Sequence, residues 1–278
     1  MGTLQIFQYN QTMHPPKSQI VIDKDLGELY FPAGDMVMAP IINRDGIWEK
    51  NEVKWLKENI RPGDSCINVG ANVGYFAILM SQLTGVQGSV FAFEPNPEVV
   101  PFFNRNIEDR RIENVKLYEY AAGNRNGRQI MYLNRKNFGD SRMYNPKTTK
   151  GGGDYKVHGF HRIPRRRFVE IVTLDSVIKE KVDVVLIDAQ GYDHQVLLGM
   201  QSIIEKYRPK ILAEFTPQWL SDLGDDPVQI LRQYMSWGYT LGSTDFESSA
   251  NAQPEEILEK CSLLDTFYAN ITLTPKTP

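Results

Sequence analysis

The stretch of sequence that decides the fold is INVGANVGYF, residues 67–76. It continues an apolar, β-branched run, SCINV at 65–69, of the kind found in buried strands. Gly70 and Gly74 then bracket a turn that leads into a segment with helical spacing. Glycine lets the backbone turn tightly and approach a ligand that a side chain would block, although two glycines alone also suit a plain strand–turn–helix connection.

A second feature of the sequence, an acidic residue, also indicates a bound ligand. The nicotinamide fingerprint G-x-G-x-x-G is absent because Asn72 stands at its middle glycine, and no Gly-Lys-Ser/Thr of a P-loop follows. However, the next apolar run, 89–93, ends in Glu94, followed by Pro95 and Pro97. In open parallel sheets ligands bind beyond the carboxyl ends of the strands, where an acidic side chain accepts hydrogen bonds from both ribose hydroxyls. The glycine turn and Glu94 together predict a bound nucleoside.

Outward from this motif, short apolar runs alternate with helical patterns. Strands are predicted at 65–69, 89–93, 115–119, 184–188 and 210–215, and helices at 74–83, 97–109 and 192–206. A further helix is predicted at 227–237, and two more strands at 239–242 and 266–273. The alternation predicts an α/β fold whose parallel sheet is covered by helices on both faces.

Two segments depart from the alternation. Residues 1–60 predict an N-terminal extension, a small β lead-in and a helix at 49–59, which packs on a core domain of residues 61–278. Residues 134–170 predict a structureless loop, and 135–167 carry ten Lys/Arg against two Asp in a chain of net charge -3. A charge run is usually a solvated face. Arginines also bind phosphates and carboxylates well, so Arg165, Arg166 and Arg167 are candidates for binding an anionic acceptor.

Composition bounds the remaining classes. The chain has 278 residues, 41% apolar and 23% charged, enough to bury a large core. Its net charge of -3 predicts no global attraction to nucleic acid or to an anionic membrane. No signal peptide and no membrane-spanning run is visible, so a cytoplasmic location is expected. Cys66 and Cys261 are too few for a disulfide framework, and His158 and His161 lack further ligands at matching spacing, so no metal site is predicted.

Five motifs occur in an order and spacing that resemble one family. They are INVGANVGYF, FAFEPNP, YAAGNRNG, VTLDSVI and VVLIDAQGYDHQVLLGM…RPKILAEF, and the likeness covers about residues 46–216. The sequence resembles the FkbM-type S-adenosylmethionine-dependent methyltransferases. This resemblance implies the class I methyltransferase fold, a Rossmann-like, mostly parallel sheet of seven strands whose last strand is antiparallel.

The resemblance also implies the cofactor and the residues that bind it. S-adenosylmethionine is the expected cofactor and S-adenosylhomocysteine the product. The Gly70–Gly74 turn is expected to cradle the methionine end, Glu94 to hold the ribose, and the stretch around Ala121 and Ala122 to lie beside the adenine. The cofactor-binding residues so implied are Asn68, Gly70, Asn72, Gly74, Glu94, Pro95, Ala122 and Asp188.

The chain departs from the family pattern at three positions. Asn68 stands where the family usually carries Asp, and LIDAQG has Leu186 and Gln190 where Lys and Glu are common. A glutamine orients an acceptor but cannot take its proton, so Gln190 is predicted to bind substrate. Asp188, Glu214 and His194 remain as candidate catalytic bases. For Asp193 and His194, the alternative is a first helical turn facing water.

The sequence therefore predicts O-methylation of a hydroxyl on a sugar, glycoconjugate or natural product, with an anionic acceptor such as a nucleotide-linked or phosphorylated sugar. N-methylation of a peptide amide or an amine is the alternative enzyme activity. A nucleic-acid methyltransferase or binder is opposed by the acidic remainder of the chain and by the absence of the Asn/Asp-Pro-Pro-Tyr/Phe motif. Asn68 and Gln190 leave open a relative that binds a nucleoside without catalysis.

Overall fold

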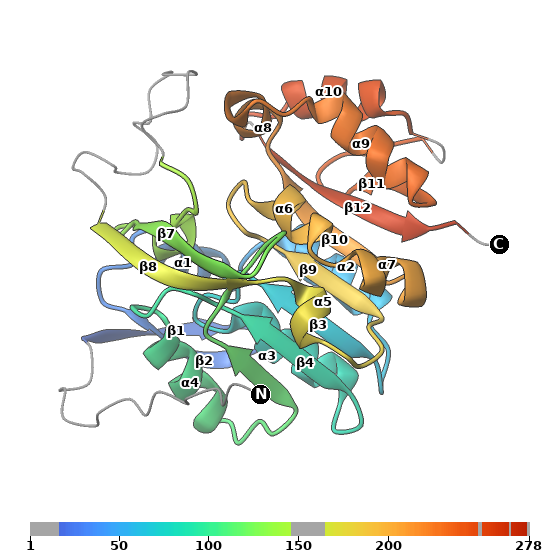
Figure 1. The fold of residues 1–278 in the computed structure, drawn as a ribbon. Coiled ribbons are helices and arrows are strands. Elements are labelled where there is room, and N and C mark those ends of the chain that lie inside the picture. The colour runs from blue at the N-terminus through green and yellow to red at the C-terminus, as the bar shows by residue number, and fades with distance from the viewer. Residues whose placement is uncertain (1–16, 146–164, 250–251, 267, 277–278) are drawn as a thin grey trace.

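The centre of the protein is a seven-stranded sheet in the order β11-β12-β10-β9-β3-β4-β5. The computed structural model describes residues 17–145, 165–249, 252–266 and 268–276. Neighbouring strands pair in parallel except at β12, which runs antiparallel to both β10 and β11 (Figure 1). The predicted class I methyltransferase fold is confirmed. The strands are β3 (Ser65–Val69), β4 (Ser89–Phe93), β5 (Val115–Tyr118), β9 (Val184–Ile187), β10 (Lys210–Phe215), β11 (Tyr239–Ser243) and β12 (Ala269–Pro275).

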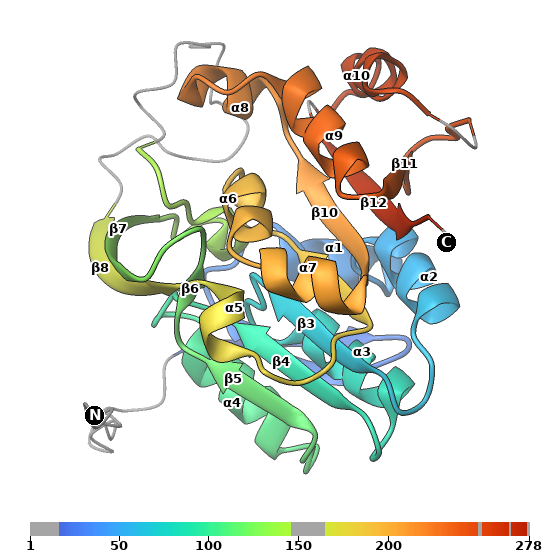
Figure 2. The ribbon, with the colours of Figure 1, turned by 45° about the vertical axis from the view of Figure 1, so that its right-hand side comes forward.

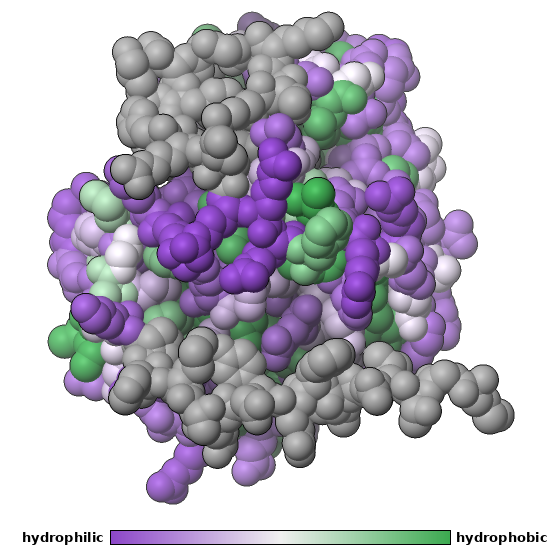
Figure 3. All heavy atoms as spheres, turned by 60° about the vertical axis from the view of Figure 1, so that its left-hand side comes forward, coloured by the Kyte–Doolittle hydropathy of each residue, from purple (hydrophilic) through white to green (hydrophobic). Residues whose placement is uncertain are grey.

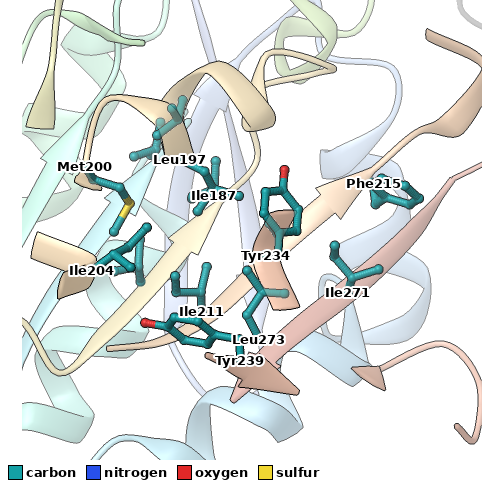
Figure 4. Packing of buried hydrophobic residues seen from close by; sticks show 14 of the residues in the cluster. Ile187, Leu197, Met200, Ile204, Ile211, Phe215, Tyr234, Tyr239, Ile271 and Leu273 are labelled. Atoms are coloured by element: carbon teal, nitrogen blue, oxygen red, sulfur yellow. The ribbon is translucent and has the colours of Figure 1, made fainter. Parts of the chain in front are cut away.

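Alternate residues of these strands enter two separate hydrophobic layers, because successive side chains of a strand point to opposite faces. One layer buries α5 (Leu174–Val177), α6 (Asp193–Leu198), α7 (Gln201–Tyr207), α9 (Pro227–Ser236) and α10 (Pro254–Ser262) against the sheet. Figure 4 shows side chains of β9, β10 and β12 meeting those of α6, α7 and α9 in this layer. The opposite layer holds α2 (Lys50–Asn59), α3 (Tyr75–Thr84) and α4 (Val100–Glu108). The helices therefore cover both faces, as Figure 2 shows from a second direction.

The segment predicted as a single helix at 192–206 is two helices, α6 and α7, separated at Gly199. A Cβ at Gly199 would lie 1.9 Å from the backbone oxygen of Gly123. The helix is therefore interrupted at the point where the loop before β7 packs closely against it. Another helix, α8 (Pro217–Leu223), follows β10 and was not predicted.

The N-terminal segment forms a hairpin and two helices that share the α3 layer. Strands β1 (Ser18–Asp23) and β2 (Gly27–Pro32) pair antiparallel, and α1 (Met38–Asp45) follows. The side chain of Asn106 on α4 accepts from the backbone N–H of Tyr30 at 2.7 Å and donates to its carbonyl at 3.0 Å. The carboxylate of Glu52 on α2 accepts from the amide of Asn270 on β12. These contacts tie residues from both ends of the chain to the same sheet.

The part of the chain between β5 and β9 forms a second, three-stranded sheet in the order β6-β8-β7. Its strands are β6 (Ala121–Ala122), β7 (Gly127–Leu133) and β8 (Arg165–Val172), and a 3-10 turn, η1, covers Phe138–Asp140. The expectation of a structureless loop over 134–170 is therefore wrong at both ends, while residues 146–164 lie outside the described part. Val169 and Ile171 are buried and alternate with exposed Phe168 and Glu170, a strand pattern that the preceding arginines obscured. In Figure 3, which turns toward the viewer the side of the molecule where β7 and β8 lie, hydrophilic side chains predominate among the coloured residues, with smaller apolar areas between them.

In the described part of the chain, every helix is too short or too polar to cross a bilayer. Cys66 and Cys261 are both buried free thiols, as expected for a chain without a disulfide framework.

Candidate active site

A cavity of about 1250 Å³ opens at the carboxyl ends of β3, β4, β9 and β10. This is the edge where ligands bind in open parallel sheets. The volume exceeds the roughly 300–1,000 Å³ of a typical small-molecule pocket, so it has room for a cofactor and an acceptor together. Its wall includes Gly70, Ala71, Asn72, Glu94, Pro95, Ala121, Ala122, Asp188, Gln190 and Glu214, with Trp48, Glu49, Arg142, Trp219 and Tyr268 from other parts of the fold.

The glycine turn after β3 is shaped by three residues with left-handed backbone. Gly70, Asn72 and Gly74 have φ values of 78°, 49° and 92°. A Cβ at Gly70 would lie 1.9 Å from the backbone oxygen of Asp188, so the glycine is needed for two loops of the protein to touch. Gly74 begins α3, and its missing side chain makes room for the ring of Phe103 instead of lining the cavity. The turn is thus as tight as expected. However, the space left by the missing side chains of Gly70 and Gly74 is taken up by other parts of the protein, namely the backbone of Asp188 and the ring of Phe103.

Glu94 lies at the end of β4 and is 5% exposed. Its Oε2 accepts from the backbone N–H of Asn72 at 2.8 Å, and its Oε1 accepts from that of Asn96 at 2.7 Å. Burial raises the pKa of Glu94 to about 7, and the two backbone hydrogen bonds oppose this rise. Each oxygen keeps further acceptor capacity toward the cavity. The helix after it starts only at Val100, so Glu94 joins two loops and does not cap α4.

The wall fits the expected cofactor in a second respect. Asn72 lines the cavity, and its Oδ1 is buried without a hydrogen-bond partner among the described residues. A buried acceptor of this kind costs free energy until a donor reaches it. The hydroxyl and amino groups of a nucleoside cofactor are such donors, and Asn72 and Glu94 present acceptors to them from two loops that a hydrogen bond joins. The residues present therefore fit S-adenosylmethionine.

Two carboxylates stand side by side at the ends of β9 and β10. The register pairs Ile187 with Ala213, so Asp188 and Glu214 follow as the next neighbours in parallel strands. The side-chain nitrogen of Gln190 donates to Asp188 Oδ1 at 2.6 Å and to Glu214 Oε2 at 3.3 Å. Burial raises the pKa of Asp188 to about 6, and burial and then the charge of Asp188 raise the pKa of Glu214 well above its usual value. A carboxylate with a pKa raised toward neutrality is suited to taking a proton.

The titratable side chains of the described wall are mostly acidic. Arg142 is the one Lys or Arg among these lining residues, and its guanidinium forms an ion pair with Asp140 at 2.5 Å. It also lies 3.9 Å from the ring centre of Trp219. The acidic lining residues are Glu49, Glu94, Asp140, Asp188, Glu214, Asp222 and Asp265. In its described part, the cavity therefore favours ligands with positive charge or with many hydroxyl groups.

Asn68 does not reach the cavity. It is 0% exposed on β3, and neither atom of its amide has a hydrogen-bond partner among the described residues. Its register partner on β9 is Leu186. Asn68 and Leu186, two of the three departures from the family pattern, are therefore neighbours in the sheet. This chain has two neutral residues where the family usually carries Asp and Lys.

His194 does not reach the cavity either, and the expectation that it and Asp193 face water is wrong. His194 is 8% exposed, its Nδ1 lies 2.9 Å from the hydroxyl of Tyr234, and burial lowers its pKa. Asp193 is buried and accepts from the backbone N–H groups of Ala189 and Gly191, both at 3.1 Å. Because α6 packs against β10, its first turn faces the protein interior.

Arg165, Arg166 and Arg167 are exposed residues of β8 and do not line the cavity. They pair in register with Leu133, Tyr132 and Met131 of β7. The neighbouring residues 146–164 lie outside the described part, and His158 and His161 are among them. In the described residues, no group of three His, Cys, Asp or Glu side chains is arranged to bind a metal ion.

Most of the outer wall comes from residues that no sequence motif marks. Glu49 and Tyr268 lie in a predicted helix and a predicted strand, but nothing in the sequence marks them or Trp219 as site residues, and the three meet only because the chain folds them over one edge of the sheet. Glu49 has a left-handed backbone with φ 38° just before α2, and its pKa is raised well above the usual value by burial and by Asp188. Arg142 was visible as part of the basic segment.

Comparison with known proteins gives a consistent result. The model of a family described as "Methyltransferase FkbM domain" matches residues 68–241, more than half of the chain. Hexuronic acid methyltransferase AglP of Haloferax volcanii is 27% identical over 164 residues, which cover 58% of this chain and 60% of that protein. Methyltransferase 1 of Beauveria bassiana is 24% identical over 149 residues, which cover 50% of this chain and 59% of that one.

Among solved structures, methyltransferase FkbM from Methylobacillus flagellatus KT aligns with a TM-score of 0.45 and 14% identity. The alignment covers 80% of this chain and 50% of that structure. A shorter match, 37% identical over 59 residues, is to the protein-L-isoaspartate O-methyltransferase of Methanothrix thermoacetophila, covering 21% of this chain and 28% of that protein. The chain thus spans less than two thirds of the length of these relatives.

Proposed function

Because this chain belongs to the FkbM methyltransferase family, whose cofactor is S-adenosylmethionine, we propose that it methylates a hydroxyl group of a sugar, glycoconjugate or natural product. The observation that carries the proposal is the pair of carboxylates, Asp188 and Glu214, held by one amide at the wall of the cavity. Glu94 and the glycine turn stand at the same edge of the sheet. Binding and proton-accepting groups therefore share one cavity.

The proposed cofactor-binding residues Gly70, Asn72, Glu94 and Ala122 all line the cavity. Gly70 and Asn72 would border the methionine end, the carboxylate of Glu94 would accept from the ribose hydroxyls, and Ala122 would lie beside the adenine. Asp188, which lines the same cavity, would face the positively charged end of the cofactor, where a negative side chain is stabilising. When bound, S-adenosylmethionine supplies a methyl group on a sulfonium sulfur, which is open to attack by an acceptor oxygen.

The acceptor hydroxyl must lose its proton as its oxygen bonds to the methyl carbon. Glu214 and Asp188 are the groups of this wall that can take that proton, which then resides on a carboxylate oxygen. Most of the remaining work is alignment, because a displacement at carbon needs the three reacting atoms in line. Trp48, Trp219 and Tyr268 support this by giving the cavity rigid aromatic walls.

The acceptor is best matched by a neutral, hydroxyl-rich molecule with at most one acidic group. One named relative is a hexuronic acid methyltransferase, and in this chain Arg142 is the residue of the described wall that would meet a carboxylate. The seven acidic lining residues favour a second candidate, N-methylation of an amine, over a strongly anionic acceptor.

The proposal is tested with S-adenosylmethionine and three probe acceptors that share one sugar ring: a methyl glucoside, its uronic acid and its 2-amino form. The release of S-adenosylhomocysteine and a product heavier by one methyl group are measured for each. Methylation of the glucoside or the uronic acid on oxygen supports the proposal. Methylation of the amino sugar on nitrogen alone would establish the second candidate. Failure to bind S-adenosylhomocysteine in calorimetry would remove the basis of both.

A further inference from the structure

The turn between β9 and α6 fixes the side chain of Gln190 from both sides. Gln190 has φ 51°, a left-handed conformation that is uncommon outside glycine, and Gly191 follows with φ 83°. The carboxylate of Asp193 accepts from the backbone N–H groups of Ala189 and Gly191 and so closes the turn. A Cβ at Gly191 would lie 2.7 Å from the ring of Trp219, so a larger residue at this position would disturb the turn.

This turn places one neutral amide between two acids. An amide nitrogen carries two hydrogens, and the distances of 2.6 Å to Asp188 and 3.3 Å to Glu214 direct one to each carboxylate. Two ionised carboxylates at neighbouring positions of parallel strands repel each other, and a donor shared between them offsets that repulsion. The hydrogen bond from Gln190 works against burial in setting the pKa of Asp188. Both hydrogens are therefore engaged before any acceptor arrives.

We propose that Gln190 is a positioning residue: its amide holds Asp188 and Glu214 as one fixed pair of proton-accepting carboxylates, and does not donate to the acceptor. The inference deepens the proposed function, because it names the residue that sets which carboxylate oxygens face the acceptor. It revises the expectation that Gln190 binds substrate directly. Glu214 is further held through Oε1, which accepts from the hydroxyl of Thr216 at 3.1 Å.

The pair is surrounded by other titratable groups that must be considered with it. Arg142 lowers the pKa of Glu214, while each of the acidic neighbours raises the pKa of one or the other carboxyl or has its own pKa raised by it. Gln190 is the neutral donor to both. The charged or titratable groups of other elements that interact electrostatically with the pair are Glu49, Glu52, Glu94, Asp140, Arg142, Asp193 and Tyr268.

The first test needs neither cofactor nor acceptor. Urea unfolding of the full chain is measured between pH 5 and 8 for the unchanged protein, Q190M and Q190E. Loss of the shared donor raises the folded-state pKa of the pair further above its unfolded value, so stability is lost over a wider range as pH rises. We expect the folding equilibrium constant of Q190M, relative to the unchanged chain, to fall by ~tenfold more at pH 8 than at pH 5, the effect of moving one carboxyl pKa by about one pH unit.

Q190E supplies an internal rescue. At pH 5 the introduced carboxyl is expected to be protonated and to donate as the amide does, so Q190E should be close to the unchanged chain. As pH rises that donor is lost and a third negative charge appears, so the deficit of Q190E should grow more steeply than that of Q190M. The matched control is Q218M, which removes another amide of the same cavity wall, one that donates to Asp222 at 3.0 Å. Deficits of Q190M and Q190E that do not change with pH would overturn the proposal.

The second test uses turnover of the best of the three sugar probes. Q190M should lower kcat by about tenfold or more and move the rise of kcat to higher pH, with the acceptor KM within about twofold. An increase in acceptor KM with an unchanged pH profile would show direct acceptor binding and overturn the proposal. If no probe is methylated, the proposed function is in doubt, and the ligand-free pH series still decides the role of Gln190.

Discussion

Two charged regions of the molecule differ in what they do with their charge. The cavity edge carries Glu94, Asp188 and Glu214, whose pKa values are raised by burial and which contact backbone or amide donors. Strand β8, which pairs with β7, carries Arg165, Arg166 and Arg167, and all three are exposed. Charged residues at the carboxyl ends of these buried strands line the cavity, while the arginines along the exposed part of β8 face water. In the described part of the chain, position at the sheet edge is therefore a better guide to the cavity wall than local charge density.

The largest effect should come from the reacting end of the cavity edge. Asp188→Asn keeps the shape and removes the charge, so kcat should fall by ~10²-fold or more if this carboxylate takes the proton. Initial rates of S-adenosylhomocysteine release measure it. Asp222→Asn is the control, because Asp222 lines the same cavity from α8. Normal turnover together with normal cofactor affinity in Asp188→Asn would leave Glu214 as the base and would weaken the comparison.

The next effect concerns the cofactor end of the same edge. Glu94→Gln should weaken S-adenosylhomocysteine binding by ~1–3 kcal/mol, because charge-assisted hydrogen bonds to a buried partner are lost. Calorimetry gives the affinity, and urea unfolding shows whether the contacts to Asn72 and Asn96 have also suffered. Glu98→Gln is the matched control, since Glu98 pairs with Arg135 on the surface. Unchanged affinity in Glu94→Gln would contradict the placement of the ribose.

A smaller effect is expected from pH. The folded-state pKa of Glu94, about 7, and that of Asp188, about 6, both lie above their unfolded values. These groups therefore stabilise the ligand-free chain at low pH, and that contribution is lost as pH rises through 6 to 7. Ionisation improves their contacts to a cationic cofactor, so S-adenosylmethionine affinity should rise from pH 6 to pH 8, by up to ~tenfold if binding lowers the pKa of one carboxyl by about one pH unit. Affinity that falls over this range would exclude both carboxylates from the cofactor site.

The smallest effect is expected on β8. Replacing Arg165, Arg166 and Arg167 with Ser should leave cofactor affinity unchanged and the acceptor KM within about twofold, because exposed substitutions away from a site have small effects. Kinetics with the uronic acid probe are the most demanding measurement. A tenfold rise in KM for that probe alone would return these arginines to the acceptor site and would reverse the comparison.

Much of the fold was predictable from the sequence, because strand and helix periodicities are local. SCINV, SVFAF and VVLI each place apolar side chains on both faces, which is typical of a strand covered by helices on either side. The predictions that were wrong share another origin. The break at Gly199 depends on the approach of Gly123, and the burial of His194 depends on Tyr234, forty residues further along. Neither contact leaves a local pattern.

The sequence by itself determined the order along the chain of the seven strands of the main sheet, the glycine turn and the acids that end the strands, because each depends on residues within a few positions of one another. Only the tertiary structure decided which of these groups act together. Asp188 and Glu214 become neighbours through the register of β9 and β10, and Gln190 reaches both from a turn that the carboxylate of Asp193 closes. The remaining wall, from Glu49 to Tyr268, is assembled across 219 positions of chain that only folding brings to one edge of the sheet. Such contacts depend on the packing of distant segments, and no spacing along the chain encodes them.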